Sequence, residues 1–135
     1  MKNKEIDIMA RTIYGEARGE LAKYGTASLI AIGNVIFNRY KKHFAKSIEN
    51  VCLAPHQFSC RNKSDPNYSK IISANEKNDI FRKCIEIATN IIDEKYPDIT
   101  DGCDHYHACY VKPYWAANIR PKHIFGSHYF YKLSK

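Results

Sequence analysis

The sequence lacks a long hydrophobic run. Its longest apolar stretch, SLIAIGNVIF at residues 28–37, is too short for the roughly 18–20 residues of a membrane-spanning helix. The first ten residues include Glu5 and Asp7 and no long apolar segment, so we expect no secretory signal peptide. We therefore expect a protein made in the cytoplasm without a transmembrane segment. Any action on the periplasm or cell wall would then need release or export by another route.

Internal repeats, low-complexity tracts and linkers are also missing from the 135 residues. A hydrophobic fraction of 44% with 13% aromatic residues is typical of a folded globule and excludes a disordered chain. The length suits one core rather than two. We expect residues 1–135 to form a single domain.

Acidic residues are fewer than basic ones. The chain carries 21 Lys and Arg against 14 Asp and Glu, a net charge of +7. This balance suits a polyanionic partner such as nucleic acid, anionic lipid or an anionic cell wall. The basic residues are scattered rather than gathered in one arm, so charge alone selects none of these partners.

The cysteines are odd in number: with five, at least one thiol has no partner within the chain. Without a secretion signal we expect the cysteines to be mostly reduced, although Cys52 and Cys60 could bridge a loop.

One stretch, CDHYHAC at residues 103–109, has the residue types of a zinc site. Its ligands would be Cys103, His105, His107 and Cys109. Their spacing of two is equally that of one face of a strand, whereas structural zinc sites use C-x₂₋₄-C pairs. We expect no metal and no other cofactor. A zinc enzyme or zinc-stabilised domain built on this cluster stays open as an alternative.

Apolar spacing predicts helices in the first two thirds of the chain. They are 4–17, a central buried helix at 24–42, a short one at 47–51 with Ser47 as N-cap, and a long one that follows a capping box of Ser73 and Glu76 and ends before Pro97. Residues 54–74 read as an irregular loop. Two aromatic, alternating segments, 103–111 and 123–133, read as strands or extended segments. The fold class is α+β, mainly α.

Glu16 is the most suggestive single residue. It follows Ile13 by three positions and so continues the buried stripe of the first helix, at the helix end. Partial desolvation and the negative end of the helix dipole would both favour a protonated carboxyl, as a general acid requires. The flanking glycines, Gly15 and Gly19, would let a bulky polymer approach. A surface residue at a frayed helix end is the alternative.

Five short blocks appear in order along the chain: TIYGEARGE, AIGNVIFNR, APHQFS, HYHACYVKPYW and FGSHYFYK. Together, from about residue 8 to 132, they resemble the SleB-like cell-wall hydrolases, a family of spore-cortex-lytic enzymes and related phage and bacterial peptidoglycan hydrolases. The resemblance implies a compact lysozyme-like fold, related to lytic transglycosylases, with a small C-terminal β or irregular part. Phe125 departs from the aliphatic residue that many relatives have before the last glycine.

The resemblance also implies a site. The first glutamate of the family's G-E-A-R-G-E block is its catalytic acid and falls on Glu16. The second glutamate, Glu20, is placed with the substrate-binding residues, with capping of the next helix or pairing with Arg18 as the alternative. The remaining expected substrate contacts are Gln57, Phe58, Ser59, His105, Tyr106 and His107 in the cleft, with Tyr114 and Trp115 as a sugar-stacking wall.

The implied activity is cleavage of the β-1,4 bond between N-acetylmuramic acid and N-acetylglucosamine. No second acid has a convincing setting, since Asp65, Asp101 and Asp104 fall in loops. A lone acid favours the lytic transglycosylase route, and hydrolysis by the same glutamate is the near alternative. A basic module that binds cell wall or nucleic acid without catalysis is the alternative from another class. We expect a monomer acting on glycan strands rather than nucleic acid, most simply as a phage or prophage endolysin.

Overall fold

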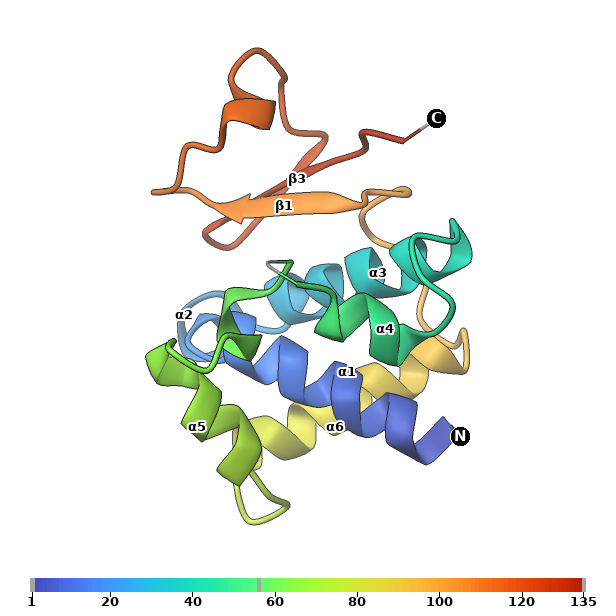
Figure 1. Ribbon diagram of the computed structural model, residues 1–135, viewed down its shortest axis with the longest axis vertical. Helices are drawn as coiled ribbons and strands as arrows, with labels where there is room; N and C mark the ends of the chain where they lie inside the picture. The colour runs from blue at the N-terminus through green and yellow to red at the C-terminus, as the bar shows by residue number, and fades with distance from the viewer. Residues whose placement is uncertain (1, 56, 135) are drawn as a thin grey trace.

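The computed structural model describes residues 2–55 and 57–134. In chain order its elements are α1 (Lys2–Ala17), α2 (Glu20–Tyr24), α3 (Ala27–Lys41), α4 (Ile48–Leu53), η1 (Ser59–Arg61), α5 (Pro66–Ser73), α6 (Asp79–Ile92), β1 (His105–Ala108), η2 (Tyr114–Ala116), β2 (His123–Phe125) and β3 (His128–Tyr131). Figure 1 shows the helices packed together on one side of the small sheet. In the described part of the chain, no helix has the length and apolar character to cross a membrane.

Helices α1, α3 and α6 supply the core. Met9 and Ile13 of α1 are fully buried, as are Ile32 and Ile36 of α3, and Ile87 of α6 is nearly so. Burial along nearly all sides of α3 confirms the prediction of a central helix at 24–42, with α2 as a separate short helix before it. The mainly α class is confirmed.

The segment 54–74 is more regular than predicted. It contains η1 and the two-turn helix α5. The carboxylate of Asp65 accepts a hydrogen bond from the backbone N–H of Asn67 at 2.8 Å, and Pro66 occupies the first helical position. An aspartate N-cap followed by proline is a helix start signal that the loop interpretation overlooked.

Of the two predicted helix caps, one is confirmed and one is wrong. The hydroxyl of Ser47 accepts from the backbone N–H of Asn50 at 3.0 Å at the start of α4. The S-x-x-E match at 73–76 caps nothing, because Ser73 ends α5. The cap of α6 is Asn78, whose side chain accepts from the N–H of Phe81 at 3.0 Å.

The sheet has the order β1-β3-β2, with both pairs antiparallel. Tyr106 pairs with Phe130, and Ile124 pairs with Tyr129. The predicted segment 123–133 is therefore a hairpin rather than one strand. Its inner face, with Phe130 fully buried, packs on the helices, and the loop between β1 and β2 arches over the outer face (Figure 1).

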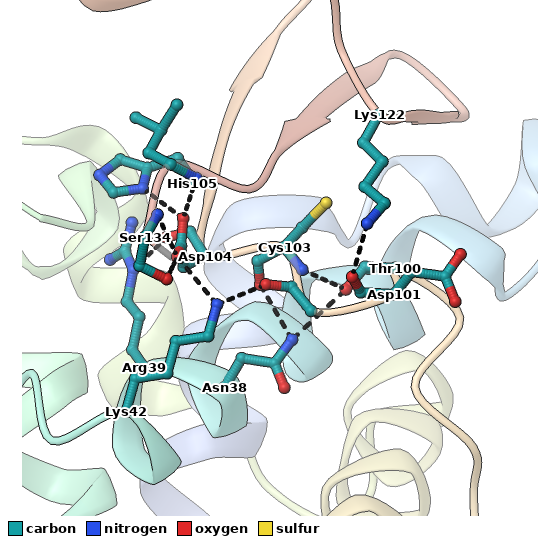
Figure 2. Close-up of polar contacts among 12 residues, drawn as sticks. Asn38, Arg39, Lys42, Thr100, Asp101, Cys103, Asp104, His105, Lys122 and Ser134 are labelled. Carbon is teal, nitrogen blue, oxygen red and sulfur yellow. Dashed lines mark hydrogen bonds and ion pairs between the residues drawn. The ribbon is translucent and has the colours of Figure 1, made fainter.

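Asp104 joins the sheet to α3 and to the C-terminal segment (Figure 2). Its carboxylate is fully buried and receives hydrogen bonds from Lys42 Nζ at 2.9 Å, from the Leu133 N–H at 2.9 Å, and from the hydroxyl of Ser134. His105 Nδ1 lies 2.8 Å from Oδ1 of the same carboxylate. A residue assigned to a loop from the sequence is thus a buried anchor of the β part.

Candidate active site

Glu16 lies in the last turn of α1, where this helix meets the sheet. Its Oε1 accepts a hydrogen bond from the Tyr106 hydroxyl at 2.5 Å, and its Oε2 accepts from the backbone N–H of Cys60 at 3.3 Å. Ile13 and Ala17, on either side along the helix, are buried, and Glu16 itself is partly buried. The apolar periodicity of α1 therefore places this carboxylate at the edge of the core, as predicted.

Gly15 has a different role from the one expected of it. A Cβ at this position would lie 2.6 Å from Ile71 Cγ2 and 2.7 Å from Cys60 Sγ. Glycine therefore lets η1 and α5 pack directly against α1, which brings the Cys60 N–H to Glu16. Gly19, by contrast, has open space around it, with no atom within 4 Å of a Cβ there.

Tyr106 reaches Glu16 from β1. Its ring stacks on Phe130, with centroids 5.6 Å apart, and meets His128 edge-on at 5.6 Å. Burial raises the pKa of Tyr106 well above its ordinary value, and the neighbouring charge and hydrogen bond of Glu16 act in the same direction. Its hydroxyl therefore stays protonated and donates a hydrogen bond to the Glu16 carboxylate.

A cleft of about 330 Å³ opens at Glu16, between the end of α1, the segment that precedes α5, and β1. Four of the residues predicted to contact substrate line it: Gln57, Ser59, Tyr106 and His107. The other described lining residues are Gly15, Glu16, Arg39, Asn67, Ala108, Tyr110, Val111 and His128. Glu16 is the only carboxylate among these described residues.

Phe58 lies below the cleft rather than in it. It is 1% exposed, its ring is 6.4 Å from that of Tyr106, and the guanidinium carbon of Arg39 lies 5.3 Å from its centroid. Phe58 is thus a packing residue under two side chains that line the cleft, and it does not reach a ligand there.

Glu20 is not among the lining residues of the cleft and holds the hairpin turn. Its two carboxylate oxygens accept hydrogen bonds from the N–H and the hydroxyl of Ser127, both at 2.8 Å, and His128 Nδ1 lies 3.3 Å from Oε1. Gly126, with φ of 58°, leaves room for this carboxylate, because a Cβ there would collide with Oε1. The contacts of Glu20 in the structure are thus with the β2–β3 turn, and its predicted contact with substrate stays a prediction.

The electrostatics of this pair fit a structural role. Burial raises the pKa of Glu20, but the hydrogen bonds from Ser127 and the proximity of His128 outweigh it, and the net shift is downward. Burial likewise lowers the pKa of His128. An ionised Glu20 and a neutral His128 are the favoured forms near neutral pH.

His105 and Trp115 lie on the outer face of the sheet. The indole meets His105 at 5.3 Å, His107 at 5.8 Å and Tyr131 at 5.2 Å between ring centroids, each edge-on. Trp115 is therefore the anchor that fastens the β1–β2 loop to the sheet, and neither residue lines the cleft. The expected sugar-stacking role of Trp115 is not supported by this position.

Tyr114 stands outward from the same loop and is 91% exposed. It borders a second groove of about 550 Å³ between the loop and the outer face of the sheet. This groove shares His107 and Val111 with the cleft at Glu16, so the two hollows adjoin. An aromatic surface there remains available to a long ligand.

The ligand-type side chains of the CDHYHAC stretch, all of which lie in the described part of the chain, do not gather into one cluster. Among the residues that the structure describes, no group of three or more His, Cys, Asp and Glu side chains is placed to hold a metal ion. Both ring nitrogens of His107 are engaged, Nδ1 with the Ala108 carbonyl and Nε2 with the Tyr131 hydroxyl, each at 2.8 Å. Cys103 is buried and Cys109 is exposed, and all five thiols are free, so Cys52 and Cys60 form no bridge.

Arg39 and His128 are cleft residues that the sequence analysis missed. Arg39 continues the apolar pattern of α3, three and four positions after Ile36 and Val35, and it is 5% exposed. A cation on the buried face of a helix is a signal for a functional or network residue that could have been noticed. His128 offered no such signal, since its place follows from the hairpin.

Comparisons with known proteins agree with this architecture. The chain matches the cell wall hydrolase family over residues 25–131. A search of curated protein sequences gives no significant match. The match to the family begins after Glu16, so the placement of this residue rests on the structure.

Two solved structures share the fold. The catalytic domain of the Bacillus cereus SleB protein is 22% identical, with a TM-score of 0.71 over 95% of this chain and 89% of that one. The catalytic domain of the germination-specific lytic transglycosylase SleB from Bacillus anthracis is 21% identical, with a TM-score of 0.70 over 93% and 92%. The sequence resemblance to SleB-like enzymes is thereby confirmed, and the chain belongs to the cell wall hydrolase family.

Proposed function

We propose that this protein degrades peptidoglycan by cleaving the β-1,4 bond between N-acetylmuramic acid and N-acetylglucosamine, as a lytic transglycosylase with Glu16 as its acid. The observation that carries the proposal is the placement of Glu16, the only carboxylate among the described cleft residues, fixed by donors from β1 and η1. Membership of the cell wall hydrolase family and the shared fold with a lytic transglycosylase support the substrate and the reaction.

The first half of the reaction is a proton transfer. Oε1 of Glu16 is occupied by the short hydrogen bond from Tyr106, and the contact of Oε2 with the Cys60 N–H is longer, at 3.3 Å. Oε2 is therefore the oxygen that carries the transferable proton. It donates this proton to the bridging oxygen, the bond to the muramyl C1 breaks, and positive charge develops at C1. Tyr106 stabilises the carboxylate that is left.

The second half returns the proton. The ionised Glu16 takes a proton from the 6-hydroxyl of the same muramyl unit, and this oxygen bonds to C1 to close a 1,6-anhydro ring. No water is consumed, and Glu16 ends protonated as it began. The hydroxyl is tethered next to C1, and an intramolecular nucleophile has a large advantage in effective concentration over water.

The absence of a partner acid among the described cleft residues favours this route over hydrolysis. A two-carboxylate glycosidase places its second acid about 5–9.5 Å from the first, inside the cleft. Glu20, the nearest candidate in the sequence, is bound to the Ser127 turn, and Asp104 is sealed in the network with Lys42. Neither is placed to activate water.

Mass spectrometry of the fragments released from purified sacculi tests the proposal. The wild type is expected to release 1,6-anhydro-muramyl products, and Glu16→Gln is expected to release none while keeping the thermal stability of the wild type. Reducing muramyl ends would make the enzyme a hydrolytic muramidase. A wild type that binds sacculi without releasing fragments, with binding unchanged in Glu16→Gln, would replace the enzyme with a wall-binding module.

We further propose that the enzyme acts on the cell wall after release from the cytoplasm, in the manner of a phage endolysin. The net charge of +7 supports binding to an anionic wall. Expression in a bacterial host tests this role: lysis is expected only when a membrane-permeabilising protein is co-expressed. Lysis without that protein would mean that the chain reaches the wall unaided.

A further inference from the structure

Arg39 is a buried cation at the cleft that takes no part in the proposed cleavage reaction. Its side chain is 5% exposed, and its Nε donates to the backbone carbonyl of Asp104 at 2.7 Å. Its Nη1 donates to Oε1 of Gln57 at 3.2 Å. No ion pair links Arg39 to a carboxylate among the described residues, and buried charges normally have such a partner.

The remaining nitrogen, Nη2, takes part in neither of these bonds. Arg39 is a lining residue, and Nη2 has no hydrogen bond to a described residue. In the described part of the chain no fully buried side-chain nitrogen or oxygen lacks a partner, so Nη2 is not sealed in the interior. Two N–H groups of a guanidinium whose position is fixed by two other bonds are thus presented to a ligand.

Gln57 adds donors of the same kind. Its side chain is exposed and lines the cleft, and its Oε1 accepts from Arg39. Because the carbonyl end of this amide is turned toward Arg39, its NH₂ end is free to donate elsewhere. Arg39 and Gln57 together form a pair of hydrogen-bond donors, and the group that fits between them is an oxygen acceptor.

We propose that Arg39, with Gln57 beside it, binds the carbonyl oxygen of the 2-acetamido group of the sugar next to the bond that is cleaved, and so selects N-acetylated glycan. This inference rests on the proposed glycan substrate. Charge-assisted hydrogen bonds from a fixed guanidinium are strong and directional. A neutral carbonyl oxygen can accept such a bond, so the group that Arg39 binds does not have to be an anion.

The acetamido group is favoured over a carboxylate of the peptide stem because of position. In a β-1,4-linked amino sugar the acetamido group is on C2, directly beside the C1 atom at which Glu16 acts. It must therefore enter the cleft with the scissile bond. The free carboxylates of the stem are separated from the ring by the lactyl group and at least one amino acid, whereas Arg39 is deeply buried.

Binding of two neutral oligosaccharides tests the inference without turnover, in protein that carries Glu16→Gln. Chitotetraose and cellotetraose share the β-1,4 backbone and differ by an acetamido group or a hydroxyl at each C2. We expect chitotetraose to bind ~10–100-fold more tightly, as a charge-assisted hydrogen bond supplies. Adding Arg39→Met should bring the ratio close to one by weakening chitotetraose alone. The matched control Arg82→Met, on the exposed face of α6, should keep the full ratio.

Gln57→Leu keeps the test valid if Arg39→Met does not fold, because the exposed Gln57 side chain contributes little to the core. It is expected to lower the same ratio by several-fold. An unchanged ratio in a folded Arg39→Met or Gln57→Leu protein would overturn the inference. So would weaker binding of peptide-bearing muropeptides with chitotetraose unaffected, since that pattern identifies a stem carboxylate.

The two proposals fail separately. Sacculi that release fragments, with no dependence of the sugar preference on Arg39, would overturn the inference and leave the enzymatic function standing. An Arg39-dependent preference for chitotetraose, in a protein that releases no fragments from sacculi, would overturn the enzymatic function and keep the sugar site.

Discussion

The hydroxyl of Tyr106 and the carboxylate of Glu16 are joined by a 2.5 Å hydrogen bond, although 90 positions separate them in the sequence. The bond connects the end of the first helix to the first strand, so the proposed acid is held by both parts of the fold. Because the phenol is fixed by packing on Phe130 and His128, its direction does not depend on Glu16.

Tyr106→Phe tests the importance of this bond. The variant keeps the ring and its packing but loses the donor to the carboxylate that forms when Glu16 gives up its proton. We expect kcat for glycan cleavage to fall by ~10–100-fold with little change in KM, since a hydrogen bond to a charged group contributes about 1.5–3 kcal/mol. Thermal stability should change little, because the ring and its contacts with Phe130 and His128 are kept.

Tyr14→Phe is the matched control. It removes the hydroxyl that accepts a hydrogen bond from Asn78 Nδ2 at 2.9 Å, on a buried tyrosine that does not line the cleft. A loss of activity in Tyr106→Phe that is matched by a loss of thermal stability, or the same loss of activity in Tyr14→Phe, would show that the Tyr106 bond serves only the fold.

Glu20→Gln distinguishes a hairpin anchor from a sugar contact. The amide can replace at most part of the set of bonds to the Ser127 N–H, its hydroxyl and His128. We expect the free energy of unfolding to fall by about 2 kcal/mol in urea titrations at pH 7. KM for soluble glycan should change little. A raised KM with unchanged stability would restore the role predicted from the sequence.

The sequence correctly predicted features that depend on residues close together in the chain, such as the course of a helix and its cap. The stripe of Ile13 and Ala17 located α1 and put Glu16 at the core edge, and the Ser47 cap was found because capping involves residues three positions apart. Contacts between distant segments were not predictable in this way. Nothing near Glu20 in the sequence points to a turn more than 100 residues later.

Aromatic residues were the least predictable in their roles. Tyr114 and Trp115 are adjacent and equally suited by type to stack on sugars, yet one is exposed and the other packs on His105 and His107. Their difference follows from the path of a loop over a sheet whose register the sequence alone does not fix. The family resemblance predicted more of the residues that line the cleft than the apolar periodicity did.

The pair Tyr114→Ala and Trp115→Ala makes this difference measurable. Trp115→Ala removes the three ring contacts that hold the loop, and it should reduce the free energy of unfolding by about 2–3 kcal/mol. Tyr114→Ala removes an exposed ring and should alter stability by less than about 0.5 kcal/mol. If the adjoining groove takes part of the glycan, Tyr114→Ala alone should raise KM about fivefold, or ~1 kcal/mol. Equal stability of the two variants would contradict the anchoring role of Trp115.

Asp104→Asn should destabilise the β part in a way that depends on pH. Burial alone would raise the pKa of Asp104, but hydrogen bonds from Ser134, His105, Leu133 and Lys42 outweigh it and hold the pKa well below its ordinary value. The asparagine would keep an acceptor oxygen, but the Lys42 ammonium would lose the buried negative charge beside it, and we expect a loss of about 3 kcal/mol at pH 7.

The sign of the pH effect follows from the lowered pKa. The folded protein binds the Asp104 proton less tightly than the unfolded chain, so the stabilisation is complete above the ordinary aspartate pKa of about 4 and declines as the pH falls below it. Urea titrations should therefore give a constant difference between wild type and Asp104→Asn from pH 7 to about 5, and a shrinking one toward pH 3. Asp79→Asn, at an exposed position on α6, serves as the control and should show little difference at any pH. A difference between wild type and Asp104→Asn that stays constant through pH 3 would mean that Asp104 stabilises the fold through its shape and not through its charge.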